Sequence, residues 1–155
     1  NWHYIGHLQT NKVKEAVKIF ELIHSVDSER LLREIDKQAH KPDKVQKILL
    51  QINIAEEESK FGTSESDLEK LVQIAQVLDN VSLEGLMVIG PLTDDQTLIR
   101  SVFARGYRHF CELKPICDNF KYLSMGMSDD YPIALQEGAN MVRIGSKIFG
   151  KRVYK

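Results

Sequence analysis

Apolar residues along the chain follow two spacings, one typical of β-strands and the other typical of α-helices. The strand-like segments are short runs rich in aliphatic and β-branched residues. They occupy residues 2–6, 22–26, 47–55, 83–89, 122–125 and 141–144. Between these runs, apolar residues recur three and four positions apart, which predicts amphipathic helices. The whole pattern predicts six strands with five helical connections.

One predicted helix has a clear start signal. Ser64 and Asp67 resemble a capping box, in which a serine and an acidic residue three positions later satisfy backbone N–H groups of the first turn. The apolar face that follows consists of Leu68, Leu71, Val72, Ala75 and Leu78. A longer helical stretch is expected over residues 95–113, although Gly106 lowers its helix propensity.

Alternating strands and helices of these lengths are typical of an α/β fold with a parallel sheet and right-handed crossovers. Two architectures satisfy the pattern, an open doubly wound sheet and a (β/α) barrel. No linker or low-complexity stretch divides the sequence, so residues 1–155 are expected to form a single domain.

Composition and charge narrow the class of protein. Hydrophobic residues make up 43% and charged residues 28% of the 155 residues, as in ordinary globular proteins. Lys and Arg (21) nearly balance Asp and Glu (22), which gives no general attraction for nucleic acid or an anionic membrane. No apolar run approaches the roughly 18 residues of a bilayer span, and no signal-peptide pattern opens the chain. We therefore expect a cytoplasmic protein with no nucleic-acid or membrane partner.

Cysteines and histidines offer no clear metal site. Cys111 and Cys117 lie close to His109, but a lone C-x5-C lacks the paired spacing of zinc ligands. We expect reduced thiols and no metal. His3 either faces the interior of the sheet or simply packs, and packing is the favoured interpretation. His24 is expected near a strand end without a metal-ligand partner.

Polar and glycine-rich clusters follow the predicted strand ends, which share one face in any parallel β/α fold. Two of them, SMGMS at 124–128 and Gly145-Ser146, offer hydroxyls and backbone N–H groups suited to a phosphate. Each cluster is also typical of a turn that merely needs glycine and a capping serine. The two together leave a phosphate site and a pair of ordinary turns as open alternatives. Motifs of dinucleotide enzymes, P-loop NTPases and α/β-hydrolases are not found in the sequence.

Several segments resemble, in collinear order, the pyridoxal 5′-phosphate (PLP) homeostasis protein family. They are WHYIGHLQTNK at 2–12, HSVDS at 24–28, QINI at 51–54, SKFG at 59–62, GLM at 85–87, LSMGMSDDY at 123–131 and MVRIGSKIFG at 141–150. The resemblance covers essentially the whole chain.

This resemblance implies a barrel similar to the N-terminal domain of alanine racemase, with PLP at the strand carboxyl ends. It implies a noncatalytic role in vitamin B6 and amino-acid balance. By position, Ser124, Met127 and Ser128 would hold the phosphate, Gly145 and Ser146 would complete the cup, and Arg143 would face the pyridine nitrogen.

Two family segments are not found in the sequence. One is an "SKTK"-like motif whose lysine forms the Schiff base with PLP, and the other reads roughly "FGENYVQE". The chain is therefore expected to begin at the family's third strand and to carry about six of eight βα units. An alternative is a fragment of a racemase-like PLP enzyme, but racemases need a second domain that supplies a tyrosine base.

Overall fold

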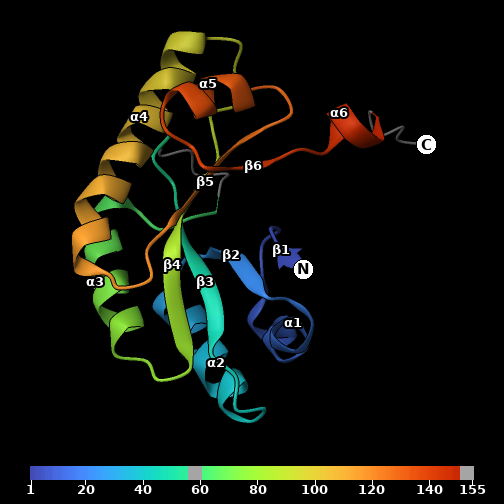
Figure 1. Ribbon diagram of the computed structural model, residues 1–155, viewed down its shortest axis with the longest axis vertical. Coiled ribbons are helices and arrows are strands. Elements are labelled where there is room, and N and C mark those ends of the chain that lie inside the picture. The colour runs from blue at the N-terminus through green and yellow to red at the C-terminus, as the bar shows by residue number, and fades with distance from the viewer. Residues whose placement is uncertain (56–60, 151–155) are drawn as a thin grey trace.

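A computed structural model of the chain describes residues 1–55 and 61–150. Ser59 and Lys60 of the SKFG segment lie outside these described residues. Strands and helices alternate along the described chain (Figure 1). The strands are β1 (His3–Tyr4), β2 (Leu22–Val26), β3 (Gln46–Ile52), β4 (Val81–Val88), β5 (Tyr122–Met127) and β6 (Met141–Arg143). The helices are α1 (Val13–Ile19), α2 (Glu29–His40), α3 (Glu65–Gln76), α4 (Gln96–Leu113), α5 (Tyr131–Gln136) and α6 (Ser146–Phe149). Short 3-10 turns, η1 (Thr10–Lys12) and η2 (Lys114–Ile116), adjoin α1 and α4.

The described strands form one parallel sheet in the order β1-β2-β3-β4-β5-β6, so each strand pairs with its neighbours in sequence. Strands β2 and β5 would be about 14 Å apart in a flat sheet, since each strand spacing is about 4.8 Å. His24 Nδ1 on β2 nevertheless lies 3.0 Å from Ser124 Oγ on β5. The sheet therefore curls around its inner face, which confirms an incomplete (β/α) barrel rather than a doubly wound sheet.

Helices α2, α3 and α4 cover the outer face of the sheet (Figure 1). The main core lies between these helices and the strands, where Leu32, Ile48 and Phe103 are fully buried. A smaller apolar cluster of Leu22, Leu49 and Met87 fills the inner face. Burying a large apolar side chain is worth about 1.5–3 kcal/mol, so both clusters stabilise the fold.

Two local sequence signals act as expected. Ser64 Oγ accepts the backbone N–H of Asp67 at 3.1 Å, which confirms the predicted cap of α3. Gly106 is buried inside α4, where an added Cβ would lie only 2.9 Å from Val88 Cγ2. This glycine therefore lets α4 approach β4 closely, which offsets its low helix propensity.

Other elements depart from the sequence-based expectation. Strand β3 ends at Ile52 rather than at residue 55, because the chain turns away and Asn53 N–H donates to the carbonyl of Thr63 (2.9 Å). The helical connection between the last two strands is short and occupies only Tyr131–Gln136. Helix α6 is not anticipated, since four residues are too few to show helical periodicity.

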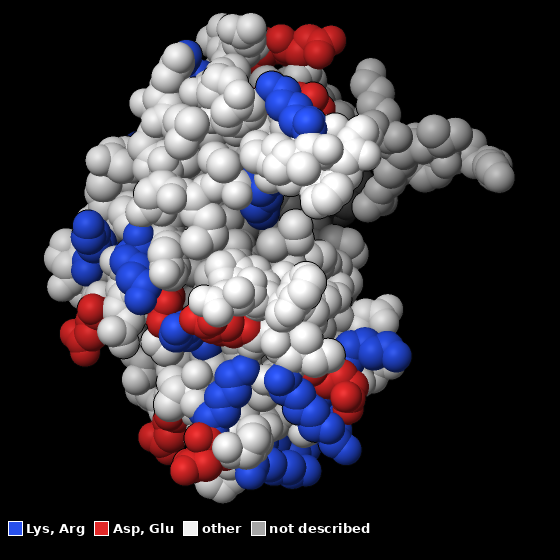
Figure 2. All heavy atoms as spheres, turned by 45° about the vertical axis from the view of Figure 1, so that its right-hand side comes forward, with Lys and Arg blue, Asp and Glu red and all other residues white. Residues whose placement is uncertain are grey.

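Charged side chains of both signs are interleaved on the surface. Figure 2 shows Lys and Arg beside Asp and Glu over the lower part of the face in view. Ion pairs such as Lys47–Glu21 and Arg33–Glu29, each with 2.9 Å between nitrogen and oxygen, account for part of this mixing. None of the helices in the described residues is long and apolar enough to cross a membrane.

Candidate functional site

A cavity of about 620 Å³ opens at the carboxyl ends of the outer strands. Four separate parts of the chain contribute to its wall: β1, β2, the turn after β5, and the β6–α6 segment. Its lining residues are His3, Ile5, His24, Met127, Ser128, Asp129, Met141, Val142, Arg143, Ile144, Gly145 and Ser146. Loops at this end of parallel strands are the usual ligand site of barrel folds.

Gly126 shapes the turn that brings Ser128 to this cavity. Its φ of 92° lies in the left-handed region, and an added Cβ would sit 2.6 Å from the Cβ of Ala134. The buried Ser128 hydroxyl accepts the backbone N–H groups of Gly145 (3.2 Å) and Lys147 (3.3 Å). Two backbone donors thus converge on one oxygen, and an added Cβ on Gly145 would meet nothing within 4 Å.

Arg143 is held rigidly at the end of β6. Its Nη1 donates to the carbonyl (2.8 Å) and the hydroxyl (2.9 Å) of Ser124, and its Nη2 donates to the carbonyl of Val88 (2.9 Å). A guanidinium has five N–H groups, so two of them have no acceptor among the described residues. Burial lowers the pKa of Arg143 to about 10, partly offset by the charge of Asp130, and the side chain stays cationic at neutral pH.

His24 and His3 lie beside this arginine. His24 Nδ1 is 3.0 Å from the Ser124 hydroxyl, and its Nε2 is 3.2 Å from His3 Nδ1. Burial, with the positive charges of His3 and Arg143, lowers the pKa of His24 to about 3. His24 is therefore neutral under ordinary conditions.

The structure brings five of the six predicted site residues together. Met127, Ser128, Arg143, Gly145 and Ser146 all line the cavity. Ser124 does not line it, because its side chain is fully buried and its hydroxyl is bonded to His24 and Arg143.

Sequence reasoning missed both histidines of the cavity. His3 is exposed there rather than packed. His24 bonds to Ser124 and His3, two contacts that the sequence did not predict. The alternation of side chains along β2 could have predicted that His24 faces inward, since it lies two residues after the inward-facing Leu22.

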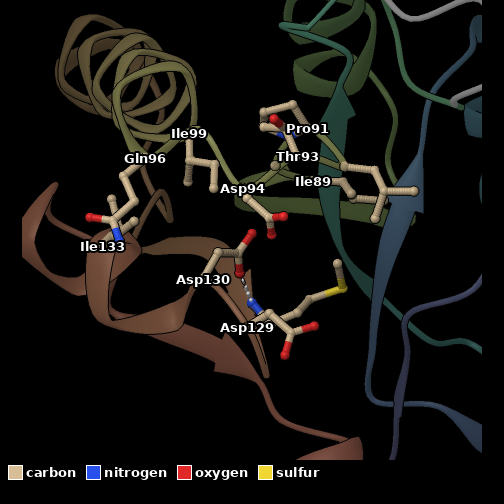
Figure 3. Close-up of a pocket in the computed structure, with 12 residues that line it drawn as sticks. Ile89, Pro91, Thr93, Asp94, Gln96, Ile99, Asp129, Asp130 and Ile133 are labelled. Carbon is tan, nitrogen blue, oxygen red and sulfur yellow. Dashed lines mark hydrogen bonds between the residues drawn. The ribbon is translucent and has the colours of Figure 1, made fainter.

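A second cavity, of about 650 Å³, lies where β4 ends and α4 and α5 begin. Figure 3 shows the carboxylates of Asp94 and Asp130 pointing toward one another inside it. Asp130 Oδ1 also accepts the Met127 N–H at 2.6 Å. Asp129 lines this cavity as well, while its described lining includes no Lys, Arg or His. Asp129 borders the cavity of Arg143 too, but only that cavity also holds a cation that would attract a phosphate.

Metal ligands do not gather at either cavity. The described residues contain no group of three His, Cys, Asp or Glu side chains placed to hold a metal ion. Cys111 is exposed, Cys117 is buried, and both are free thiols.

Comparison with known proteins agrees with this geometry. The sequence profile of the family described as "Alanine racemase, N-terminal domain" matches residues 1–153. The chain is 39% identical to the pyridoxal phosphate homeostasis protein of Aquifex aeolicus, covering 99% of this chain and 68% of that protein. It is 42% identical to the Helicobacter pylori (strain J99) protein of the same name, covering 96% of this chain and 66% of that protein. The chain thus spans about two thirds of the length of these curated relatives.

Solved structures give the same result. PipY of Synechococcus elongatus, solved without PLP, superposes with a TM-score of 0.89 at 38% identity, covering 97% of this chain and 71% of that one. The same protein solved with PLP bound gives a TM-score of 0.87 at 37% identity, covering 97% and 70%. The chain belongs to the alanine racemase N-terminal domain family and, within it, to the pyridoxal phosphate homeostasis proteins.

Proposed function

We propose that the chain binds PLP in the cavity of Arg143, as a noncatalytic carrier or regulator in intracellular vitamin B6 and amino-acid homeostasis. The observation that carries this proposal is the presence, in one cavity, of a half-buried cation with uncommitted N–H groups and of a serine hydroxyl on which two backbone N–H groups converge. A cavity of about 620 Å³ is within the usual range for such ligands. The PLP-bound structure of PipY supports the same assignment.

The residues present fit the chemical groups of PLP. The phosphate would lie against Ser128, Gly145 and Ser146, whose hydroxyls and N–H groups suit an anion. Met127 would border it. Arg143 would donate a hydrogen bond to the pyridine nitrogen, and Ser124 would act from behind by holding Arg143.

Arg143 also supports the noncatalytic part of the proposal. When bound, PLP supplies a pyridine ring that withdraws electrons best when its nitrogen is protonated. Arginine only donates hydrogen bonds, and its charge disfavours a second positive charge beside it. The ring would therefore stay unprotonated and remain a weak electron sink. Homologues named as homeostasis proteins agree with this role.

The wider setting follows from the same features. We propose that residues 1–155 act as one PLP-binding domain located in the cytoplasm. Free thiols at Cys111 and Cys117 and the interleaved surface charges support this setting, with PLP as the partner rather than a nucleic acid or a membrane.

Binding by the phosphate cup can be tested with two serine variants. Ser128→Ala and Ser146→Ala each remove a hydroxyl from the cup. Each is expected to weaken PLP binding by about 10- to 150-fold, since a hydrogen bond to a charged group is worth about 1.5–3 kcal/mol. Equilibrium dialysis at pH 7.5 measures this affinity. Ser101→Ala, at an exposed position on α4, is the matched control and should bind as the unmodified chain does. Unchanged affinity in both cup variants would place the phosphate elsewhere.

Absence of turnover needs a separate test. The PLP-loaded chain, incubated with L-amino acids in deuterated water, should exchange α-protons no faster than free PLP does. Proton NMR follows the exchange, and free PLP at equal concentration is the control. Sustained exchange well above that control, lost in Arg143→Met, would favour the racemase-like alternative instead.

A further inference from the structure

A chain of polar side chains crosses the inner face of the curled sheet. It runs from His3 on β1 through His24 on β2 and Ser124 on β5 to Arg143 on β6. The links measure 3.2 Å, 3.0 Å and 2.9 Å in that order. It therefore joins both outer strands of the described sheet through its interior.

Only one placement of the protons along this series of hydrogen bonds satisfies all four side chains. Arg143 can only donate, so the Ser124 hydroxyl oxygen accepts its Nη1–H. Among the described residues, the hydroxyl proton of Ser124 then has an acceptor only in His24 Nδ1. His24 is neutral, which leaves its single proton on Nε2, and that proton is donated to Nδ1 of His3. The reverse arrangement would strand the Ser124 hydroxyl proton in a fully buried site.

We propose that Ser124 and neutral His24 are positioning residues, which hold Arg143 as a donor directed at an unprotonated ring nitrogen of the ligand. The protons of these hydrogen bonds all point away from the arginine, so the Ser124 oxygen keeps a lone pair directed at Nη1. A charged imidazole at His24 would donate to that same oxygen from the other side and compete with the arginine. The identity of the ligand rests on the proposed function, whereas the direction of the hydrogen bonds between Arg143 and His3 does not.

The first test needs no ligand. Long-range proton–nitrogen NMR of the chain labelled with 15N-histidine reports the tautomer of each imidazole, and His24→Asn identifies the His24 signals. At pH 7.5, His24 should be neutral with its proton on Nε2. A proton on Nδ1, or an imidazolium, would overturn the proposal whatever the ligand proves to be.

The second test uses 4-deoxypyridoxine 5′-phosphate, a probe that keeps the pyridine ring and phosphate but has no aldehyde to react with lysines. Ser124→Ala should weaken probe binding by about 5- to 10-fold, the usual cost of one lost hydrogen bond. The absorbance of the bound probe should also shift toward the protonated-ring form. Ser25→Ala is the matched control, because the buried Ser25 hydroxyl has no hydrogen-bond partner among the described residues.

Two changes at His24 separate positioning from packing. In His24→Asn an amide oxygen can replace Nδ1 as the acceptor, so affinity and absorbance should stay close to those of the unmodified chain. In His24→Leu both should change as in Ser124→Ala, and combining the two changes should add little. Wild-type affinity and absorbance in both Ser124→Ala and His24→Leu would contradict the positioning role. Failure of the probe to bind the unmodified protein would count against the proposed function. The tautomer measurement would then decide the direction of the hydrogen bonds by itself.

Discussion

Individual side chains in this protein are tuned mainly by burial. His24 is enclosed on the inner face of the sheet, between His3 and Arg143, and burial is the largest cause of its lowered pKa. Arg143 is half-buried, and desolvation lowers its pKa only to about 10, partly offset by the charge of Asp130, so it stays cationic. The backbone carbonyls of Ser124 and Val88 accept its N–H groups. A neutral imidazole and a charged guanidinium thus lie in one polar network.

Stability at acid pH follows from the pKa of His24. An unfolded histidine binds a proton below its ordinary pKa of 6.5, whereas the folded chain binds it only near pH 3. The unfolded state therefore holds more protons between these values, and falling pH favours unfolding. His24 should cost about 1.4 kcal/mol of unfolding free energy per pH unit over this window.

Urea denaturation of the unmodified chain and of His24→Asn between pH 7 and pH 4 isolates this contribution. The difference in unfolding free energy between the two proteins should change progressively below pH 6.5 in favour of the asparagine variant. Parallel stability profiles would show that His24 titrates normally in the folded chain.

At the scale of elements, local signals decide where segments start, and long-range contacts decide where they end. Helix α3 begins after Ser64 because the serine hydroxyl satisfies an N–H group of the first turn. Ser64→Ala should lower the free energy of unfolding by about 1 kcal/mol, as loss of an N-terminal cap usually does. Thermal and urea denaturation measure the change. Ser101→Ala is the control, because Ser101 lies in the interior of α4 and caps no helix. This variant should be neutral or slightly stabilising, since alanine is the better helix former.

Periodicity alone was enough to predict most of these elements. Strand β2 occupies residues 22–26 in both the prediction and the structure, because a full apolar run between two polar turns has clear limits. The site was predictable only in part. Met127, Ser128, Gly145 and Ser146 carry a glycine–hydroxyl signal, whereas the contact between His24 and Ser124 joins residues 100 positions apart. No local pattern reports such a contact, since the curl of the sheet creates it.

At the scale of the whole molecule, the curled sheet carries two cavities of similar size that differ in their charged side chains. Asp129 lines both; the first also has Arg143, His3 and His24, whereas the second has Asp94 and Asp130 and no cation in its described lining. Both share Met127 and Asp129, so the end of β5 and the turn after it stand between them. A phosphate ligand distinguishes the two, because only one of them offers a cation and convergent N–H groups.

Amide NMR of the 15N-labelled chain during titration with PLP tests directly whether the cofactor occupies the cavity of Arg143. We predict saturable shifts at the amides of Gly145, Ser146 and Lys147, together with a shift of the His24 imidazole. Shifts confined to Leu92, Thr93 and Gln96 of the aspartate-lined cavity, or no saturable shifts at all, would contradict PLP binding at this site.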